Sequence, residues 1–176
     1  PLGIQAILGN HDYWWEGGPD PVVAALRGAG VEVRLNDAVR IDRGGHRFWV
    51  SGTESLLARR LGRGRFAGRA DVAAAMAAID DEAPVIHLAH EPDLIRQVPQ
   101  RVAVTLAGHT HGGQVDLPFF GRPITRRYDL EWIHGHYEVD GSHLVVSAGL
   151  GCTFLPVRFM VPPEITLVTL GPAAAV

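Results

Sequence analysis

The chain has 176 residues, of which 47% are hydrophobic and 20% are charged, as is ordinary for a globular domain with its own core. This composition excludes a chain that is disordered throughout. The net charge of −3 does not favour a dedicated nucleic-acid-binding function, which usually needs a strong basic excess. Cys152 is the single cysteine, so no intrachain disulfide can form, and no run of 18 apolar residues predicts a membrane span.

The first third of the chain predicts strands around one helix. Asp20-Pro21 ahead of residues 22–26 is typical of a helix start, with proline in the first turn. Residues 56–68 are rich in arginine and glycine and predict a mobile loop. Strands are expected at residues 3–8, 31–35, 38–42 and 46–52.

The rest of the chain alternates helices with strands and then continues as a hairpin. Helices are expected at 71–80 and 93–98. This order predicts an α/β layered sandwich, and because no internal break divides the sequence, residues 1–176 are expected to form a single, partial domain. Strands are expected at residues 85–89, 102–107, 133–139, 143–147 and 165–170.

Three of the predicted strands end in side chains that can bind metal ions. In open α/β sheets, ligands bind beyond the carboxyl ends of the strands, which the fold brings together. Imidazole, amide and carboxylate groups without a nearby cysteine favour Mn, Fe or Zn over a thiolate centre. The residues at the three strand ends are Asn10, His11 and Asp12, then His90, Glu91 and Asp93, and finally His109 and His111.

The segment Gly108-His109-Thr110-His111-Gly112-Gly113 continues directly from the third of these strands. In extended chain, residues two apart point the same way, so His109 and His111 are expected to face one cleft, about 6–7 Å apart at their backbones. That spacing suits two ions about 3.5–4 Å apart, with one ligand for each. Two such ions would bring a bridging water toward hydroxide near neutral pH and balance charge on a phosphate.

Three motifs follow one another in the chain, namely Gly9-Asn10-His11-Asp12, the isolated His90 and Gly108-His109-Thr110-His111. In order and spacing they resemble the last three motifs of the calcineurin-like metallophosphoesterase family. Longer segments resemble a bacterial subgroup of membrane-associated or exported members, so the similarity covers nearly the whole chain. These segments are His90-Glu91-Pro92-Asp93, Gly112-Gly113-Gln114-Val115, Leu117-Pro118-Phe119-Phe120-Gly121, Gly149-Leu150-Gly151 and Pro162-Pro163-Glu164-Ile165-Thr166-Leu167.

The resemblance implies two metal ions, of Mn, Fe or Zn, with a ligand set for each. Asn10, His90 and His109 would ligate one ion, and His111 the other. The intact fold would be a four-layer α/β/β/α sandwich, of which this chain supplies the C-terminal half. The implied function is metal-dependent hydrolysis of a phosphomonoester or phosphodiester, with a bridging hydroxide as the nucleophile.

The same resemblance gives His11 a catalytic role rather than a ligating one. His11 would face the substrate, where it steadies a phosphoryl oxygen or protonates the leaving group. From its adjacency, Asp12 is expected to orient His11 by a hydrogen bond. Gly112 and Gly113 would let the backbone approach the bound phosphate closely.

The sequence departs from the family at its beginning. An Asp-x-His motif and a Gly-Asp-x-x-Asp motif precede the others in the family, and neither occurs here. The chain is therefore expected to be truncated at its N-terminus, and the fragment to bind metal weakly and hydrolyse little. The alternative is a non-catalytic metal-binding or scaffolding module derived from the same fold, and a third is a binding domain without metal.

The residues define the substrate and the partners less closely than they define the metal site. Proteins of the family act on nucleotides, phosphoproteins or lipid-linked sugar nucleotides, and the subgroup resemblance favours a membrane-associated phosphodiester of the UDP-diacylglucosamine type. The expected partner is thus a phosphate-ester substrate, with a lipid-linked one as the narrower option. Oligomeric state is not indicated, and localisation is left open between cytoplasmic and membrane-associated.

Other histidines and the cysteine receive a structural interpretation. His87 should face the opposite side of its strand from His90. His134 and His136 are assigned to a solvated face or to the rim of the cleft. Cys152 is expected to be a small buried residue rather than a nucleophile, because no motif pairs it with a base.

Two interpretations are possible for the arginine-rich and aromatic segments, namely contact with the substrate or a purely structural role. The arginines of residues 59–69 would attract an anionic substrate or lipid headgroup, although a solvated loop is favoured. Trp14-Trp15 and Phe119-Phe120 would either form an apolar rim for a lipid-like substrate or pack against the core and loops.

Overall fold

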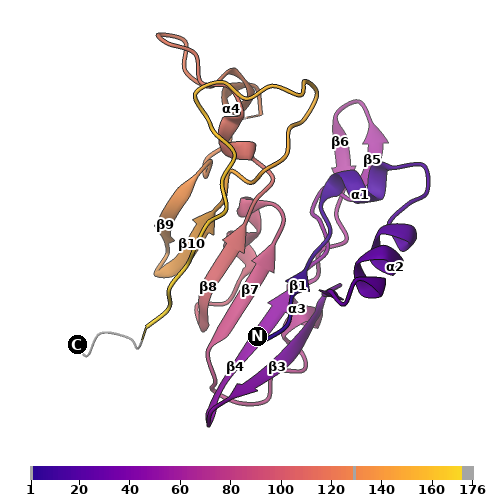
Figure 1. The fold of residues 1–176 in the computed structure, drawn as a ribbon, viewed down its shortest axis with the longest axis vertical. Coiled ribbons are helices and arrows are strands. Elements are labelled where there is room, and N and C mark those ends of the chain that lie inside the picture. Colours follow the sequence, from indigo (N-terminus) through magenta and orange to yellow (C-terminus); the bar gives the residue numbers. More distant parts are fainter. Residues whose placement is uncertain (1, 129, 172–176) are drawn as a thin grey trace.

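A six-stranded sheet forms the centre of the molecule in the computed structural model, which describes residues 2–128 and 130–171 (Figure 1). The sheet has the order β3-β4-β7-β8-β10-β9, parallel from β4 to β10 and antiparallel at both edges. The mixed α/β class is therefore confirmed. The strands are β3 (Asp37–Arg43), β4 (His46–Gly52), β7 (Val85–Ala89), β8 (Val102–Ala107), β9 (Gly135–Val139) and β10 (Ser142–Val146).

A separate pair of short strands is formed by the N-terminal segment. β1 (Gln5–Ala6) pairs in parallel with β2 (Glu32–Val33), and α2 (Asp20–Gly28) lies between them in the chain. The segment after β1 crosses the end of β4 so closely that a Cβ at Gly52 would lie 2.7 Å from Ile7. The described residues contain the large sheet, this pair and one further two-stranded hairpin, so the four-layer arrangement stays a prediction for the intact fold.

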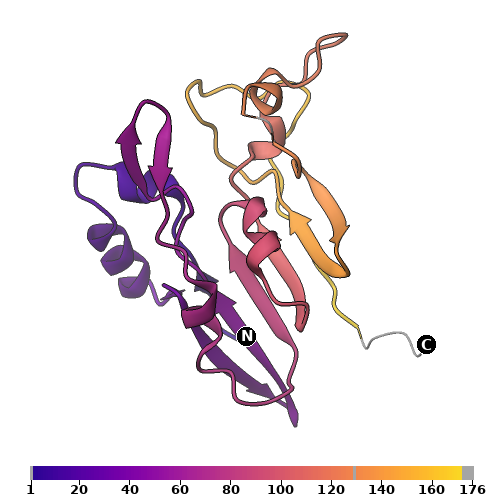
Figure 2. The ribbon, with the colours of Figure 1, turned by 180° about the vertical axis from the view of Figure 1, so that it is seen from behind.

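The hydrophobic core lies on one face of the sheet. In Figure 2, α3 (Val72–Met76) and the 3-10 helix η1 (Pro92–Gln97) lie in front of that face. Leu144 and Val146 of β10 are fully buried there and pack with Trp132 and Leu94. Burial of such a side chain contributes about 1.5–3 kcal/mol, so this face holds the strand ends of the site in place.

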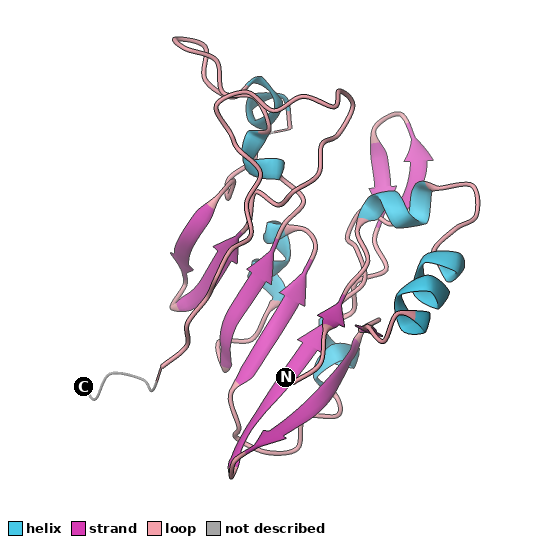
Figure 3. Ribbon diagram, viewed as in Figure 1, coloured by secondary structure: helices cyan, strands magenta, loops and turns pink. Residues whose placement is uncertain are grey.

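Residues 56–68 form a hairpin, and the prediction of a mobile loop is wrong. β5 (Arg59–Gly62) and β6 (Arg65–Ala67) pair antiparallel around a turn with positive φ at Gly62, Arg63 and Gly64 (Figure 3). Trp14 explains the order, because its ring stacks on Phe66 at 5.5 Å and lies 3.8 Å from the Arg60 guanidinium. Trp14 thus packs against this hairpin, whereas Trp15 is exposed.

Two further expectations fail at the C-terminal end of the chain. Residues 165–170 have no strand assignment, because within the described part of the chain no neighbouring strand pairs with them. Ile165 and Leu167 are accordingly exposed. Cys152 is exposed rather than buried, since it lies in the irregular segment between β10 and Val161.

The other expected elements agree with the sequence in place and type, and several of them are shorter than expected. The helix expected at 71–80 is α3, capped by the Asp71 side chain, which accepts a hydrogen bond from Ala74. The helix expected at 93–98 is η1. His46 and His143, which flank turns, are exposed. Among the described residues, no helix has the length and apolar character needed to span a membrane.

Candidate metal centre

The predicted catalytic and metal-binding side chains lie around one cleft of about 950 Å³. The parallel strands β7 and β8 end at the same edge of the sheet, which places His90 and His109 side by side. The third segment is α1 (Asn10–Trp14), which begins just after the buried Leu8. The cleft-lining residues among those predicted are Asn10, His11, Asp12, His90, His109 and His111.

Three of these side chains bring ligand atoms together. Nε2 of His90 lies 3.0 Å from Oδ1 of Asn10 and 3.2 Å from Nδ1 of His109. The two imidazole rings meet edge to face, with centroids 4.9 Å apart. Ligand atoms about 2.0–2.2 Å from one Zn²⁺ or similar ion are separated by about 3 Å, so this group fits a metal ion.

The backbone of the loop after β8 is not extended, in contrast to the reasoning from residue spacing. His109 and His111 have φ values of 67° and 53°, in the left-handed region that non-glycine residues rarely adopt. Both rings still line the cleft. Such residues cost about 1–3 kcal/mol each and cluster at functional sites, so the strain itself marks this loop.

His111 begins the short 3-10 turn η2 (His111–Gly113), and its backbone is bound by a side chain from a later segment. Its Nδ1 atom is buried and makes no hydrogen bond of good geometry among the described residues. Its carbonyl oxygen accepts a hydrogen bond of 3.1 Å from the guanidinium of Arg158. The same guanidinium donates to the carbonyls of Ala148 and Gly151, so Arg158 ties the loop at 148–151 to His111.

Burial favours the neutral form of the imidazoles of His90, His109 and His111. It lowers the pKa of His90 to about 3 and that of His109 to about 4, and neighbouring histidines add to the effect. Burial also lowers the pKa of His111, with the positive charge of Arg158 as a further cause. Neutral imidazole is the form that binds metal ions, so these rings are prepared as ligands at neutral pH.

His11 and Asp12 differ from the ligand group in their surroundings. His11 is exposed on α1, with its ring 4.8 Å from that of Trp14. The Asp12 carboxylate accepts a hydrogen bond of 2.7 Å from the backbone N–H of Gly9, and so caps the start of α1. Asp12 therefore fixes the helix that carries Asn10 and His11, and a direct bond to His11 stays a prediction.

Gly112 and Gly113 lie beneath the cleft. Both are buried, and their backbone N–H groups point to the side chain and the carbonyl of Thr110. A Cβ at Gly112 would lie 2.8 Å from Ala148, and one at Gly113 would lie 2.8 Å from Arg122. The glycines are thus required by the tight turn, while their contact with a substrate stays a prediction.

Glu91 is one of the metal-competent residues expected at the strand ends, although it was not assigned to the ligand set. One of its oxygens lies within 4.8 Å of ligand atoms of His90 and His109. Both oxygens are already engaged, by the hydroxyl of Ser55 at 2.5 Å and the backbone N–H of Leu56 at 2.9 Å. Burial raises the pKa of this carboxyl, and the two hydrogen bonds oppose that effect.

Comparison with known proteins gives a family for this site. No family model matches the chain. The chain is 33% identical over 174 residues to metallophosphoesterase YkuE of Bacillus subtilis, with 97% of this chain and 57% of YkuE covered. It is 34% identical over 171 residues to a metallophosphoesterase of Aquifex aeolicus, with 97% and 61% covered. It is 29% identical over 169 residues to phosphodiesterase YaeI of Escherichia coli, with 94% and 57% covered.

These matches extend along nearly the whole chain, although the chain spans only 57–61% of the length of the three relatives. The similarity agrees with the family that the motifs of Asn10, His90 and His109 resemble. Along nearly its whole length, the chain is therefore similar to proteins named metallophosphoesterases.

Proposed function

We propose that the protein hydrolyses phosphate esters with two metal ions bound in the cleft. One observation carries the proposal. Side chains from three distant segments meet at Nε2 of His90, which has Oδ1 of Asn10 and Nδ1 of His109 within 3.2 Å. Structural packing does not require three polar ligand groups at one buried point. Two bound ions would supply a water of lowered pKa as the nucleophile and neutralise charge on the phosphate.

The positions of the side chains support the ligand assignment that the family resemblance implies. Asn10, His90 and His109 would hold one ion, since their ligand atoms already lie together. His111 would hold the other, with its buried Nδ1 as the ligand atom. The imidazole, amide and carboxylate chemistry favours Mn, Fe or Zn.

His11 is proposed as the group that handles the proton. It lines the same cleft and is exposed, so it can reach an ester oxygen above the ligand group. In the protonated form it would donate to the leaving oxygen as the P–O bond breaks. Asp12 supports it by capping α1 through Gly9.

The lining of the cleft supports an ester with an apolar part. The residues that line the cleft include Trp14, Leu57, Phe66, Leu130 and Phe154, whose side chains are apolar or aromatic. An aromatic or acyl group attached to the phosphate would pack there, while the phosphate faces the histidines. We therefore propose a phosphodiester with a hydrophobic substituent, a class that includes lipid-linked phosphates.

Hydrolysis of an aryl phosphodiester by the full-length protein, with and without Mn²⁺, tests the proposal. His109→Ala should lower Mn²⁺ affinity and turnover by more than about 100-fold, above the range for groups that only support a ligand. His46→Ala, an exposed histidine far along the sheet, should change neither.

The outcomes separate the possible readings of the cleft. Turnover that survives chelation, or that His109→Ala leaves intact, would refute the metal-dependent hydrolase. Tight Mn²⁺ binding without turnover of any ester would favour the non-catalytic metal-binding module instead. A preference for diesters with long acyl chains over methyl esters would support the hydrophobic substituent.

A further inference from the structure

A second group of histidines lies outside the cleft, on the hairpin of β9 and β10. His136, Glu138 and His143 occupy the exposed positions of the alternating patterns in these strands. Tyr137 and Leu144 point to the core on the opposite face. Residues that alternate in this way share one face of the hairpin, so the three polar side chains stand together.

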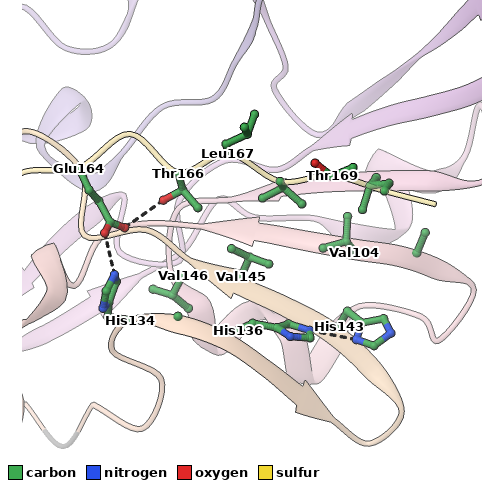
Figure 4. A pocket seen from close by; sticks show the side chains of 14 residues that line it. Val104, His134, His136, His143, Val145, Val146, Glu164, Thr166, Leu167 and Thr169 are labelled. Carbon is green, nitrogen blue, oxygen red and sulfur yellow. Dashed lines mark hydrogen bonds and ion pairs between the residues drawn. The ribbon is translucent and has the colours of Figure 1, made fainter.

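The two imidazoles of this face are in direct contact. Nε2 of His136 lies 3.1 Å from Nδ1 of His143, and the ring centroids are 5.2 Å apart. Figure 4 shows the two rings side by side, while His134 lies apart and pairs with Glu164. Both rings line a pocket of about 520 Å³ that is distinct from the metal-binding cleft.

We propose that His136 and His143 form a second metal site, for a divalent transition-metal ion of the Zn²⁺ class. Two nitrogens bound tetrahedrally at about 2.0–2.1 Å from Zn²⁺ are separated by about 3.3 Å, close to the observed 3.1 Å. In the observed contact the two nitrogens face each other, so one exposed ring must turn for both lone pairs to reach the ion. The ring that now donates its N–H would move that proton to its other nitrogen, so the imidazoles stay neutral.

Glu138 supplies a third ligand for the same ion. It is paired directly opposite His143 in the register of the two strands. Side chains at such opposed positions have Cβ atoms about 4.5–5.5 Å apart, so a change of rotamer brings the exposed carboxylate to the ion. Two imidazoles and one carboxylate form a ligand set that leaves a coordination position open to water or to a further ligand.

Zinc titration of the full-length protein tests this site independently of the hydrolase proposal. The His136→Ala/His143→Ala variant should bind one Zn²⁺ fewer per chain than the wild type, as measured by equilibrium dialysis and elemental analysis. Glu138→Gln should lower the affinity for this Zn²⁺ ion without abolishing its binding. His46→Ala, a matched exposed histidine at the start of β4, should leave the count unchanged.

Imidazole resonances of the ¹⁵N-histidine-labelled protein provide a readout at the site itself. Zn²⁺ should shift the ring nitrogens of His136 and His143, and circular dichroism should show that the double variant remains folded. The proposal is overturned if the double variant keeps the full zinc count, or if Zn²⁺ shifts neither ring.

Discussion

The cleft and the β9–β10 hairpin each bring histidines together, but the backbone that carries these residues has a different conformation in each. In the cleft, His109 and His111 lie on a loop with positive φ, partly enclosed by packing. On the hairpin, His136 and His143 lie on regular strands and are exposed. The cleft thus holds its imidazoles in fixed positions, whereas the hairpin places them by strand alternation alone.

This difference has a chemical consequence. Burial removes the solvation of the charged imidazolium, which lowers the pKa of His90 to about 3 and of His109 to about 4. A ligand that is already neutral and positioned gives up little on binding an ion. The cleft is therefore expected to bind metal more tightly than the exposed hairpin pair.

The largest effect of histidine burial that we expect is on the pH dependence of stability, and it comes from His87. It is fully buried beside Ser51, and burial lowers its pKa from 6.5 to about 4. The unfolded chain takes up this proton as the pH falls below about 6.5, and the native protein only near 4, so stability is lost as the pH falls through this window. The loss from this residue reaches roughly 3 kcal/mol.

Urea unfolding at pH 7, 5.5 and 4.5 measures this contribution. His87→Leu should lose less stability across the window than the wild type, by roughly 3 kcal/mol. His46→Gln changes an exposed histidine and should follow the wild-type curve. Parallel curves for the wild type and His87→Leu would show that burial does not control this titration.

A smaller effect is expected from Arg158, which ties the strained loop to the segment after β10. Its guanidinium donates to carbonyl oxygens of His111, Ala148 and Gly151. Arg158→Met should lower the free energy of unfolding by about 2 kcal/mol, because hydrogen bonds from a charged donor are lost. Arg27→Met on the exposed face of α2 serves as the control in the same urea titration.

A result in which Arg158→Met and Arg27→Met unfold at the same urea concentration would rule out this role. Metal affinity adds a second measurement, since His111 would lose its support. Arg158→Lys keeps the charge but not the several donors, and should recover only part of either property.

The sequence predicted the parts of the molecule that depend on local pattern. The parallel strands β7 and β8 were expected at their observed bounds, because buried strands form continuous apolar runs. Their ends then located His90 and His109 at one edge of the sheet. The convergence at the cleft was thus available from periodicity and from the rule for strand ends.

Other features depend on contacts between distant segments, which no local pattern contains. The β5–β6 hairpin is ordered by Trp14, about 45 residues earlier in the chain, which stacks on Phe66. The positive φ of His109 overrides the extended geometry that the strand suggested. Arg158 gave no signal at all, because its partners are backbone carbonyls rather than side chains.

The smallest effect we expect comes from adding one methyl group at Gly9, which should change metal affinity in the cleft but not folding. Its φ of −93° suits alanine, yet a Cβ there would lie 2.6 Å from Cε1 and 2.8 Å from Nε2 of His90. Gly9→Ala should therefore move this ring away from Asn10 and lower metal affinity about tenfold, as loss of ligand support does. Folding should change little, because the clash is with one side chain.

Gly28→Ala provides the matched control for calorimetric metal titration. It adds the same methyl group at the end of α2, where nothing lies within 4 Å of the new Cβ. Alanine in a helix is favoured by roughly 0.5–1 kcal/mol over glycine, so this variant should be as stable as the wild type or more so, with the same affinity. Equal affinity in Gly9→Ala would mean that the ring of His90 can leave its observed position freely, and the cleft would then resemble the hairpin pair.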